Sequence, residues 1–226
     1  MEWARFSPEA KKLKLYGYWR SSNSWRIRWA LNLKKIDFNY VPVDILKGEN
    51  QEPPHKARNS MGALPVLEIN DGIFLSQSMA MLEWIEEVYT LSGPALFPGI
   101  PLERAKIREL CEIVNADTMP LQAPRIQKKY SPNLIDQKSW AAHFIREGLK
   151  SFDVTSRLCR KNFSFQDQIT AADLCLVPII YNGNRYGIDM PKEFPELWTI
   201  YERALKTDAC FKASPEQQID APKTTN

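Results

Sequence analysis

The chain has 226 residues with a formal net charge of +3, and 44% of its residues are hydrophobic. This composition is that of a globular protein, long enough for one large domain or two small ones, each with its own core. Lysine and arginine are scattered without a run of five or more, so no nucleic-acid partner is expected. No apolar run approaches the ~20 residues needed to cross a bilayer, so no membrane partner is expected either.

The cysteines and histidines indicate the redox state of the thiols and whether a metal site is expected. The four cysteines are far apart and form no Cys-x-x-Cys motif: Cys111, Cys159, Cys175 and Cys210. The N-terminus has no apolar stretch of the kind a secretory signal carries, so we predict reduced, mostly buried thiols in a cytoplasmic protein. With only two histidines, His55 and His143, the sequence predicts no metal site.

The first ninety residues alternate between strand and helix patterns. Residues 12–19 are rich in aromatic and apolar side chains, as strands are, and Trp25, Trp29 and Leu33 then recur at helical spacing. Residues 37–45 form a second predicted strand. A strand, a helix and a strand within about 35 residues predict a βαβ unit with parallel strands.

A hairpin and a helix follow a polar, proline-containing segment, residues 46–63, which we interpret as a loop with at most a short helix. "LPVLEI" and "IFLSQS" flank Asn-Asp-Gly, a sequence that suits a tight hairpin turn. Ser76 or Ser78 can then cap the helix "SMAMLEWIEEVY". The predicted order is βαβ, loop, ββα.

The remainder of the chain is predicted to be helical. Two glycines and three prolines in "TLSGPALFPGIP" interrupt the pattern. Helices are predicted at about 102–119, 136–160, 170–183 and 195–207. We therefore predict an α/β domain over residues 12–90, a linker over 91–101, an all-helical domain over 102–215, and flexible termini at 1–11 and 216–226.

The junction "RSSNSWRIR" places serines and arginines where a helix begins. Cations are unfavourable near a helix N-terminus, so Arg20, Arg26 and Arg28 call for an explanation. The free N–H groups of the first turn and the serine hydroxyls together form a site for an anion, which would offset that charge. The simpler alternative is a serine cap with long arginine side chains that reach into solvent.

Three further motifs lie near the starts of predicted strands or helices. Leu64-Pro65 precedes the hairpin, where a cis bond would turn the preceding backbone toward a peptide-like ligand, although trans bonds are far more common. Gln77-Ser78 occupies a second strand-to-helix junction, which is either another anion site or a cap. Thr170 and Asp173 have the spacing of a capping box, which we interpret as structural.

Taken together, these elements resemble a glutathione transferase, and the first motif resembles the zeta class, the maleylacetoacetate isomerases. The signature of that class is Ser-Ser-Cys-x-Trp-Arg-Val-Arg-x-Ala-Leu, and this chain has "SSNSWRIRWAL". "NSMGALP", "SQSMAMLEWIEE" and "TAADLCLVPIIYNGNRYGIDM" also resemble family motifs, so the likeness runs from about residue 13 to about 215. It implies a thioredoxin-like N-terminal domain, glutathione as cofactor, a homodimer, and a place in aromatic amino acid catabolism.

The resemblance also implies residue roles. Ser21 would donate a hydrogen bond to the glutathione sulfur, with Ser22 beside it as a second catalytic candidate. Arg185 would bind a substrate carboxylate, and Arg20, Arg26 and Arg28 are the other cations available to the site. Leu64, before a cis Pro65, would pair with the cysteinyl part of glutathione, and Gln77 with Ser78 would hold the γ-glutamyl carboxylate. The implied glutathione-binding set is Ser21, Asn23, Arg26, Asn50, Leu64, Gln77 and Ser78.

Several positions depart from the family pattern. Asn23 replaces the signature cysteine, although an amide can still donate a hydrogen bond, and Asn50 replaces a glutamine. Met119 and Ala123 replace polar residues. The residues at the centre of the implied site are retained, whereas those at its edges have changed.

Three functions are consistent with this sequence. The first is a glutathione-dependent cis–trans isomerase of maleylacetoacetate-like dicarboxylic enones. The second is a glutathione transferase or dehalogenase that acts on small electrophiles such as α-halo acids. The third is a glutathione-binding scaffold with weak catalysis, for which Asn23, Met119 and Ala123 argue. Retention of Ser21 and Gln77-Ser78 argues for the two enzymes.

Overall fold

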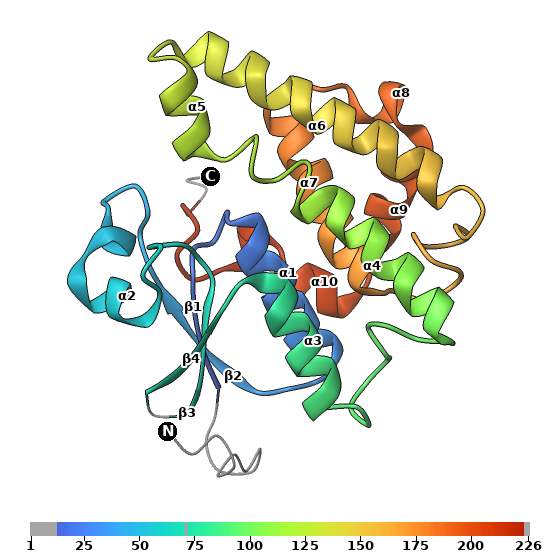
Figure 1. Ribbon diagram of the computed structural model, residues 1–226, viewed down its shortest axis with the longest axis horizontal. Helices are drawn as coiled ribbons and strands as arrows, with labels where there is room; N and C mark the ends of the chain where they lie inside the picture. Colours follow the sequence, from blue (N-terminus) through green and yellow to red (C-terminus); the bar gives the residue numbers. More distant parts are fainter. Residues whose placement is uncertain (1–12, 71, 224–226) are drawn as a thin grey trace. The chain divides into compact units, whose positions relative to one another are not determined.

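The computed structural model describes residues 13–70 and 72–223 (Figure 1). They divide into two compact units. The first contains the chain up to Gly93 together with the segment from Lys212 onward, and the second runs from Pro94 to Phe211.

The first unit begins with the predicted βαβ motif. Strand β1 (Leu13–Gly17) leads into helix α1 (Ser22–Leu33) and then strand β2 (Phe38–Pro42). The two strands are parallel, with Leu13 opposite Phe38. The prediction of a parallel strand pair joined by a helix is confirmed.

The predicted hairpin and its helix follow. Strands β3 (Val66–Asn70) and β4 (Ile73–Ser76) are antiparallel and precede helix α3 (Ser78–Val88). Gly72 has φ +79°, a conformation that glycine adopts at no steric cost, whereas Asp71 of the predicted turn lies outside the described residues. The sheet order is β2-β1-β3-β4, the mixed sheet of a thioredoxin-like domain.

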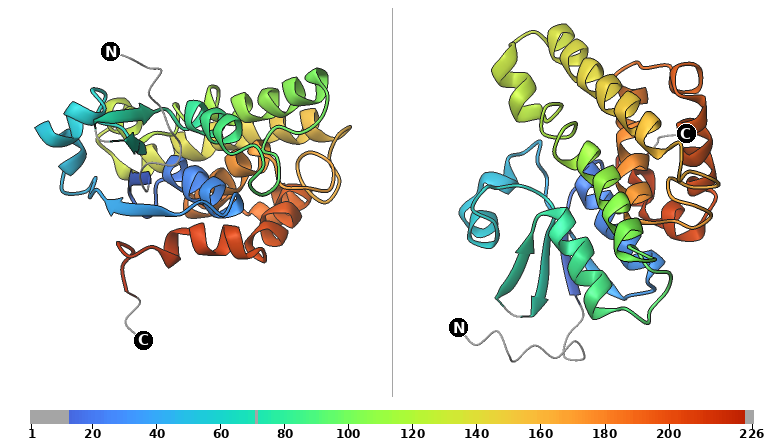
Figure 2. Two further views of the ribbon diagram at one scale, coloured as in Figure 1. Left: turned by 90° about the horizontal axis from the view of Figure 1, so that it is seen from below. Right: turned by 45° about the vertical axis from the view of Figure 1, so that its right-hand side comes forward.

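Side-chain alternation gives this sheet two buried faces. On one face Leu15 lies opposite Leu67, and both are fully buried. On the other, Tyr16 lies opposite Val66, in an apolar cluster with Val43. Helices α1 and α3 pack against each other on the first side, while α2 borders the second (Figures 1 and 2).

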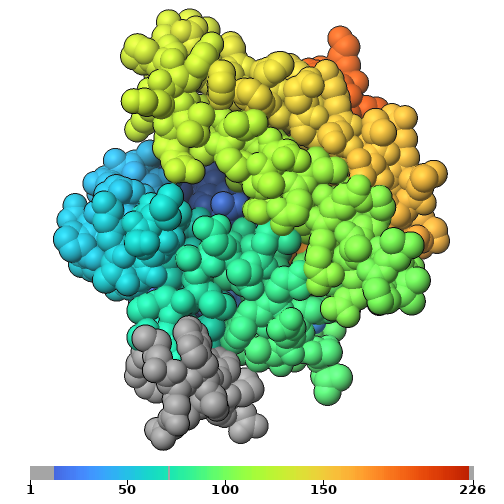
Figure 3. Space-filling model, in the orientation of Figure 1, coloured from blue at the N-terminus to red at the C-terminus, as the bar shows by residue number. Residues whose placement is uncertain are grey.

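The segment between β2 and β3 is not entirely a loop. It contains a short 3₁₀ helix, η2 (Glu49–Gln51), and helix α2 (Pro53–Arg58), whose first position is a proline that needs no hydrogen-bond partner. Residues 51–54 are exposed on the surface of the unit (Figure 3).

The second unit is helical, and the four predicted helices are present. They are α4 (Pro101–Asn115), α6 (Leu134–Ser156), α7 (Ala171–Arg185) and α9 (Pro195–Leu205). Helix α7 is the central one, with twelve of its fifteen residues buried. The sequence patterns did not predict three short helices: α5 (Pro124–Tyr130), α8 (Met190–Glu193) and α10 (Asp208–Ala213).

The end of the chain differs from the predicted domain plan. Residues from 212 belong to the first unit, and Pro215–Gln217 form the 3₁₀ helix η3. Where a flexible terminus was expected from residue 216, Asp220 accepts a hydrogen bond from the backbone N–H of Trp19 at 2.9 Å. The predicted flexible segment 1–11 lies outside the described residues.

The cysteine environments lead to a testable expectation. Cys111, Cys175 and Cys210 are buried, Cys159 is half-buried, and all four are free thiols. Burial raises the pKa of Cys159 and of Cys210, which disfavours the reactive thiolate. We expect the native protein to react slowly with a thiol reagent, at Cys159 only, and the denatured protein to react at all four. Fast labelling of a second thiol in the native state would contradict this, as would fewer than four thiols after denaturation without reductant.

Candidate active site

Ser21 caps the N-terminus of α1. Its side-chain oxygen accepts a hydrogen bond from the N–H of Ser24 at 3.2 Å, and its own N–H donates to the carbonyl of Tyr18 at 2.9 Å. The first turn of α1 contains no acidic residue. A hydroxyl has one donor and two acceptor positions, so the capping bond leaves the hydrogen of Ser21 available to donate. A cap and an anion site are therefore compatible here.

Asn23 brings an unsatisfied polar atom to the same turn. Its Oδ1 is buried and has no hydrogen-bond partner among the residues that the structure describes. A buried acceptor left without a donor costs about 1–3 kcal/mol, which a ligand N–H would recover. Ser22, the first residue of α1, is buried.

The side chain of Arg26 does not reach into solvent. It is fully buried, and its Nη1 donates to Oγ of Ser78 at 3.1 Å. This bond connects α1 to the first residue of α3. The expectation that Arg26 binds glutathione stays a prediction. The guanidinium of Arg26 donates to Ser78, the residue expected to bind the γ-glutamyl carboxylate.

Arg28 is also buried, at 1% exposure, which contradicts a solvent-directed side chain. Its Nε donates to the carbonyl of Ala213, and its two terminal nitrogens donate to the carbonyls of Tyr18 and Trp19. Burial lowers the pKa of Arg28 to about 10, so it stays charged at neutral pH. Its three nitrogens donate within the first unit, so Arg28 is not available to bind a substrate carboxylate.

The second junction is present as well. Gln77 is exposed and has φ +74°, an uncommon conformation for a residue other than glycine. Ser78 begins α3 and is buried, and the first turn of α3 contains no acidic residue. The N-terminal turns of two helices in one unit thus carry hydroxyls and no carboxylates.

The Leu64–Pro65 peptide bond is cis, as the resemblance implies. Leu64 itself is half-buried. Two residues earlier, the carbonyl of Gly62 accepts a hydrogen bond from Nδ2 of Asn50 at 2.7 Å. The amide of Asn50 thus supports the backbone that leads to Leu64.

The remaining predicted positions lie in the second unit. Arg185 is exposed at the end of α7, donates to Oδ1 of Asn182 at 2.9 Å and lies over the ring of Tyr186. Met119 and Ala123 are half-buried in the segment between α4 and α5.

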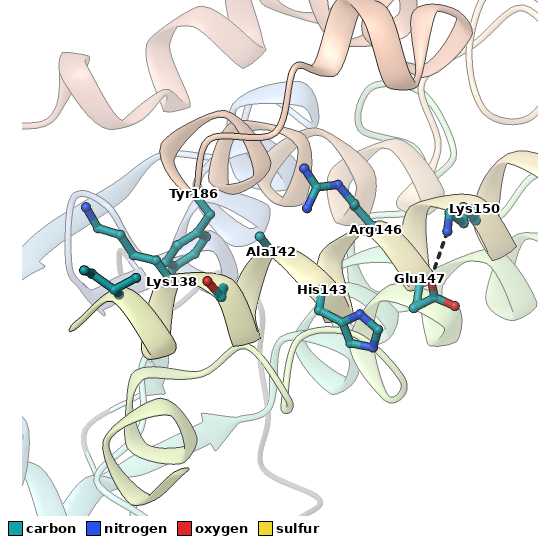
Figure 4. Close-up of a pocket in the computed structure, with 9 residues that line it drawn as sticks. Lys138, Ala142, His143, Arg146, Glu147, Lys150 and Tyr186 are labelled. Carbon is teal, nitrogen blue, oxygen red and sulfur yellow. Dashed lines mark hydrogen bonds and ion pairs between the residues drawn. The ribbon is translucent and has the colours of Figure 1, made fainter. Parts of the chain in front are cut away.

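A cavity of about 410 Å³ lies along α6 in the second unit (Figure 4). No predicted site residue lines it. Lys150 pairs with Glu147 at 3.0 Å, as the figure shows, and Arg146 pairs with Glu193 at 2.7 Å. Two of the cationic side chains that line the cavity are therefore already neutralised by carboxylates of the protein.

Ala213 and Asp220, which contact Arg28 and Trp19, were not predicted to contribute to the site. No motif marks Asp220, which is 201 residues from its partner Trp19. Over the described residues, no helix could span a membrane and no group of three or more metal-ligating side chains occurs.

A mixed four-stranded sheet with a cis-proline before β3, two serine-bearing helix N-termini, and a following helical unit together define a glutathione transferase. The family model of the glutathione S-transferase N-terminal domain matches residues 11–87. A maleylacetoacetate isomerase of Aspergillus fumigatus is 35% identical, with 94% of each chain covered. The chain belongs to the zeta class of glutathione transferases, the maleylacetoacetate isomerase family of enzymes.

Solved structures agree with this assignment. A maleylacetoacetate isomerase from Anaeromyxobacter dehalogenans, with glutathione bound in its active site, is 39% identical with a TM-score of 0.83, over 93% of this chain and 98% of that one. A maleylpyruvate isomerase described as a bacterial zeta-class glutathione transferase is 32% identical with a TM-score of 0.86, over 92% of this chain and all of the other.

Proposed function

We propose that this protein is a glutathione-dependent cis–trans isomerase of dicarboxylic enones resembling maleylacetoacetate. The observation that carries the proposal is Ser21, whose hydroxyl caps α1 and keeps a hydrogen to donate at a helix N-terminus without carboxylates. An ionised thiol is stabilised by those features.

The described residues fit glutathione in the first unit. The buried, unpartnered Oδ1 of Asn23 offers an acceptor for a ligand N–H. Gln77 and Ser78 would hold the γ-glutamyl carboxylate at the N-terminus of α3, where backbone N–H groups favour an anion. The backbone of Leu64 would pair with the cysteinyl part, supported through Gly62 by Asn50.

When bound, glutathione supplies a thiolate that adds reversibly to the conjugated double bond of the substrate and leaves after rotation about the resulting single bond. Ser21 donates to the sulfur and lowers its pKa, with Ser22 in the same helical turn. Arg185 places an exposed guanidinium on α7 for a substrate carboxylate. Because Arg26 and Arg28 are buried, Arg20 and Arg185 are the arginines proposed to bind a substrate carboxylate.

A binding measurement tests the cofactor, and two assays test the reaction. We expect calorimetry to detect glutathione binding, and we expect cis–trans isomerisation of maleylacetone with catalytic amounts of glutathione. Glutathione consumption with chloroacetates, measured in parallel, identifies a transferase or dehalogenase. Absence of binding at millimolar glutathione would contradict both enzymatic functions, whereas binding without turnover in either assay would favour the scaffold.

Assembly and location complete the proposal. We propose a homodimer, which the family resemblance supports and light scattering tests. We propose a cytoplasmic location, supported by four free thiols, since reducing compartments keep cysteines unpaired. A role in aromatic amino acid catabolism follows if the enone is the substrate.

A further inference from the structure

The turn that presents Ser21 is short and has few contacts of its own. Between the end of β1 at Gly17 and the start of α1 at Ser22, the local bonds run from Ser21 N–H to Tyr18 O and from Tyr18 N–H to Ser24 Oγ, while Ser21 itself accepts from the N–H groups of Ser24 and Trp25. None of these bonds involves the backbone of Trp19. A displacement of Trp19 would be transmitted through the chain to Ser21, two residues later.

The carboxylate of Asp220 binds the backbone N–H of Trp19 in this turn. Its Oδ2 accepts from Trp19 N–H at 2.9 Å, two residues before Ser21, and from the hydroxyl of Tyr40 on β2 at 3.4 Å. The bond to Trp19 is charge-assisted, and such bonds are about twice as strong as neutral ones.

The guanidinium of Arg28 binds two backbone carbonyls of the same turn. It donates to Tyr18 O at 3.3 Å, to Trp19 O at 2.9 Å and to Ala213 O at 2.9 Å. The same buried cation therefore binds both the turn and the end of α10. It also lies over the ring of Tyr40, 5.5 Å from the centroid, and its charge attracts Asp220.

We propose that residues 213–220, here termed the C-terminal strap, position Ser21 for the reaction, with Asp220 as the positioning residue that acts through the backbone of Trp19. Figure 2 shows the strap, in red, running alongside α1 within the first unit. The inference rests on the proposed function of Ser21. The strap contacts the turn that carries the hydroxyl directly, through Asp220 and Trp19, and indirectly, through Ala213 and Arg28. Gln77, Ser78 and Leu64 lie on other segments of the first unit.

The strap should therefore affect chemistry more than binding. A misplacement of about 1 Å can cost up to ~100-fold in rate. Since Ser21 keeps its bonds to Tyr18 and Ser24, we expect Asp220→Ala to lower kcat by ~10-fold. It should raise the pKa of the bound glutathione thiol and leave the glutathione Kd nearly unchanged. Asp220→Asn keeps an acceptor for Trp19 N–H and should recover most of the rate.

Double variants separate positioning from general damage. If Asp220 acts through Ser21, then Ser21→Ala with Asp220→Ala should be no slower than Ser21→Ala alone, within ~2-fold, because coupled residues are non-additive. Gln217→Ala is the matched control, since Gln217 lies exposed on the same strap. Multiplying effects in the double variant would overturn the proposal, as would a full rate and an unshifted thiol pKa in Asp220→Ala.

Hydrogen exchange tests the strap without glutathione. Peptides covering residues 13–24 should exchange faster in Asp220→Ala than in the wild type or Gln217→Ala, while peptides from α7 keep their protection. Unchanged exchange in residues 13–24 would overturn the proposed role of the strap, even if the wild type binds glutathione and is active. Conversely, failure of the wild type to bind glutathione contradicts the proposed function. In that case the exchange experiment alone still tests whether Asp220 fixes the turn before Ser21.

Discussion

Replacing Ser21 by alanine should lower the isomerisation rate by ~10²-fold, the lower end of the range for loss of one donor to a developing or fixed anion. The variant loses the hydrogen bond to sulfur, so more alkali is needed to form the thiolate and the pH–rate profile should move to higher pH. Glutathione affinity should change little, because the γ-glutamyl and backbone contacts are made elsewhere. The measurements are a pH–rate profile and the ultraviolet absorbance of the bound thiolate.

The cap made by Ser21 requires its own control. Alanine at an N-cap costs about 0.5–2 kcal/mol, whereas glycine costs only a few tenths relative to serine. Ser21→Gly removes the hydroxyl with little damage to the helix, and Ser21→Thr keeps a hydroxyl. We expect alanine and glycine to have the same low rate and raised thiol pKa, with threonine closer to wild type. If Ser21→Gly keeps the rate and the titration, Ser21 is a helix cap only.

The largest loss of stability is expected for Asp173→Ala. Asp173 is fully buried, and its carboxylate accepts from the N–H of Ser164 and the N–H of Thr170, each at 2.8 Å, and from the hydroxyl of Thr170 at 3.2 Å. Each buried donor left without an acceptor costs about 1–3 kcal/mol, so a total of roughly 3 kcal/mol is expected after relaxation. The measurement is the denaturant midpoint of unfolding.

A surface carboxylate on the same segment provides the matched control. Asp167 is exposed and bonds to the exposed Asn162 and Lys161, so Asp167→Ala should change the free energy of unfolding by at most ~0.5 kcal/mol. Asp173→Asn, which keeps one acceptor, should lie between the two. Equal stability of Asp173→Ala and Asp167→Ala would show that the capping box does not secure α7.

The sequence predicted the elements whose pattern is local. The βαβ and ββα order, the four long helices and the capping box of Thr170 and Asp173 depend on periodicity and on residues within a few positions of each other. These features are set by backbone hydrogen bonds between near neighbours and by one apolar face, so they can be recognised from composition and spacing. The family motifs extended this to the cis Leu64–Pro65 bond.

The arginines of α1 show what only the tertiary structure decided. Nine of the twelve residues of α1 are buried. The pattern predicted an apolar stripe at Trp25, Trp29 and Leu33 and left open whether the arginines face a bound anion or solvent. Arg26 and Arg28 are buried because partners from distant parts of the chain accept their hydrogens: Ser78, and the carbonyls of Tyr18, Trp19 and Ala213. Sequence spacing determines which side chains share a helix face, but a buried cation also needs acceptors, and only the folded chain brings these together across up to 185 residues.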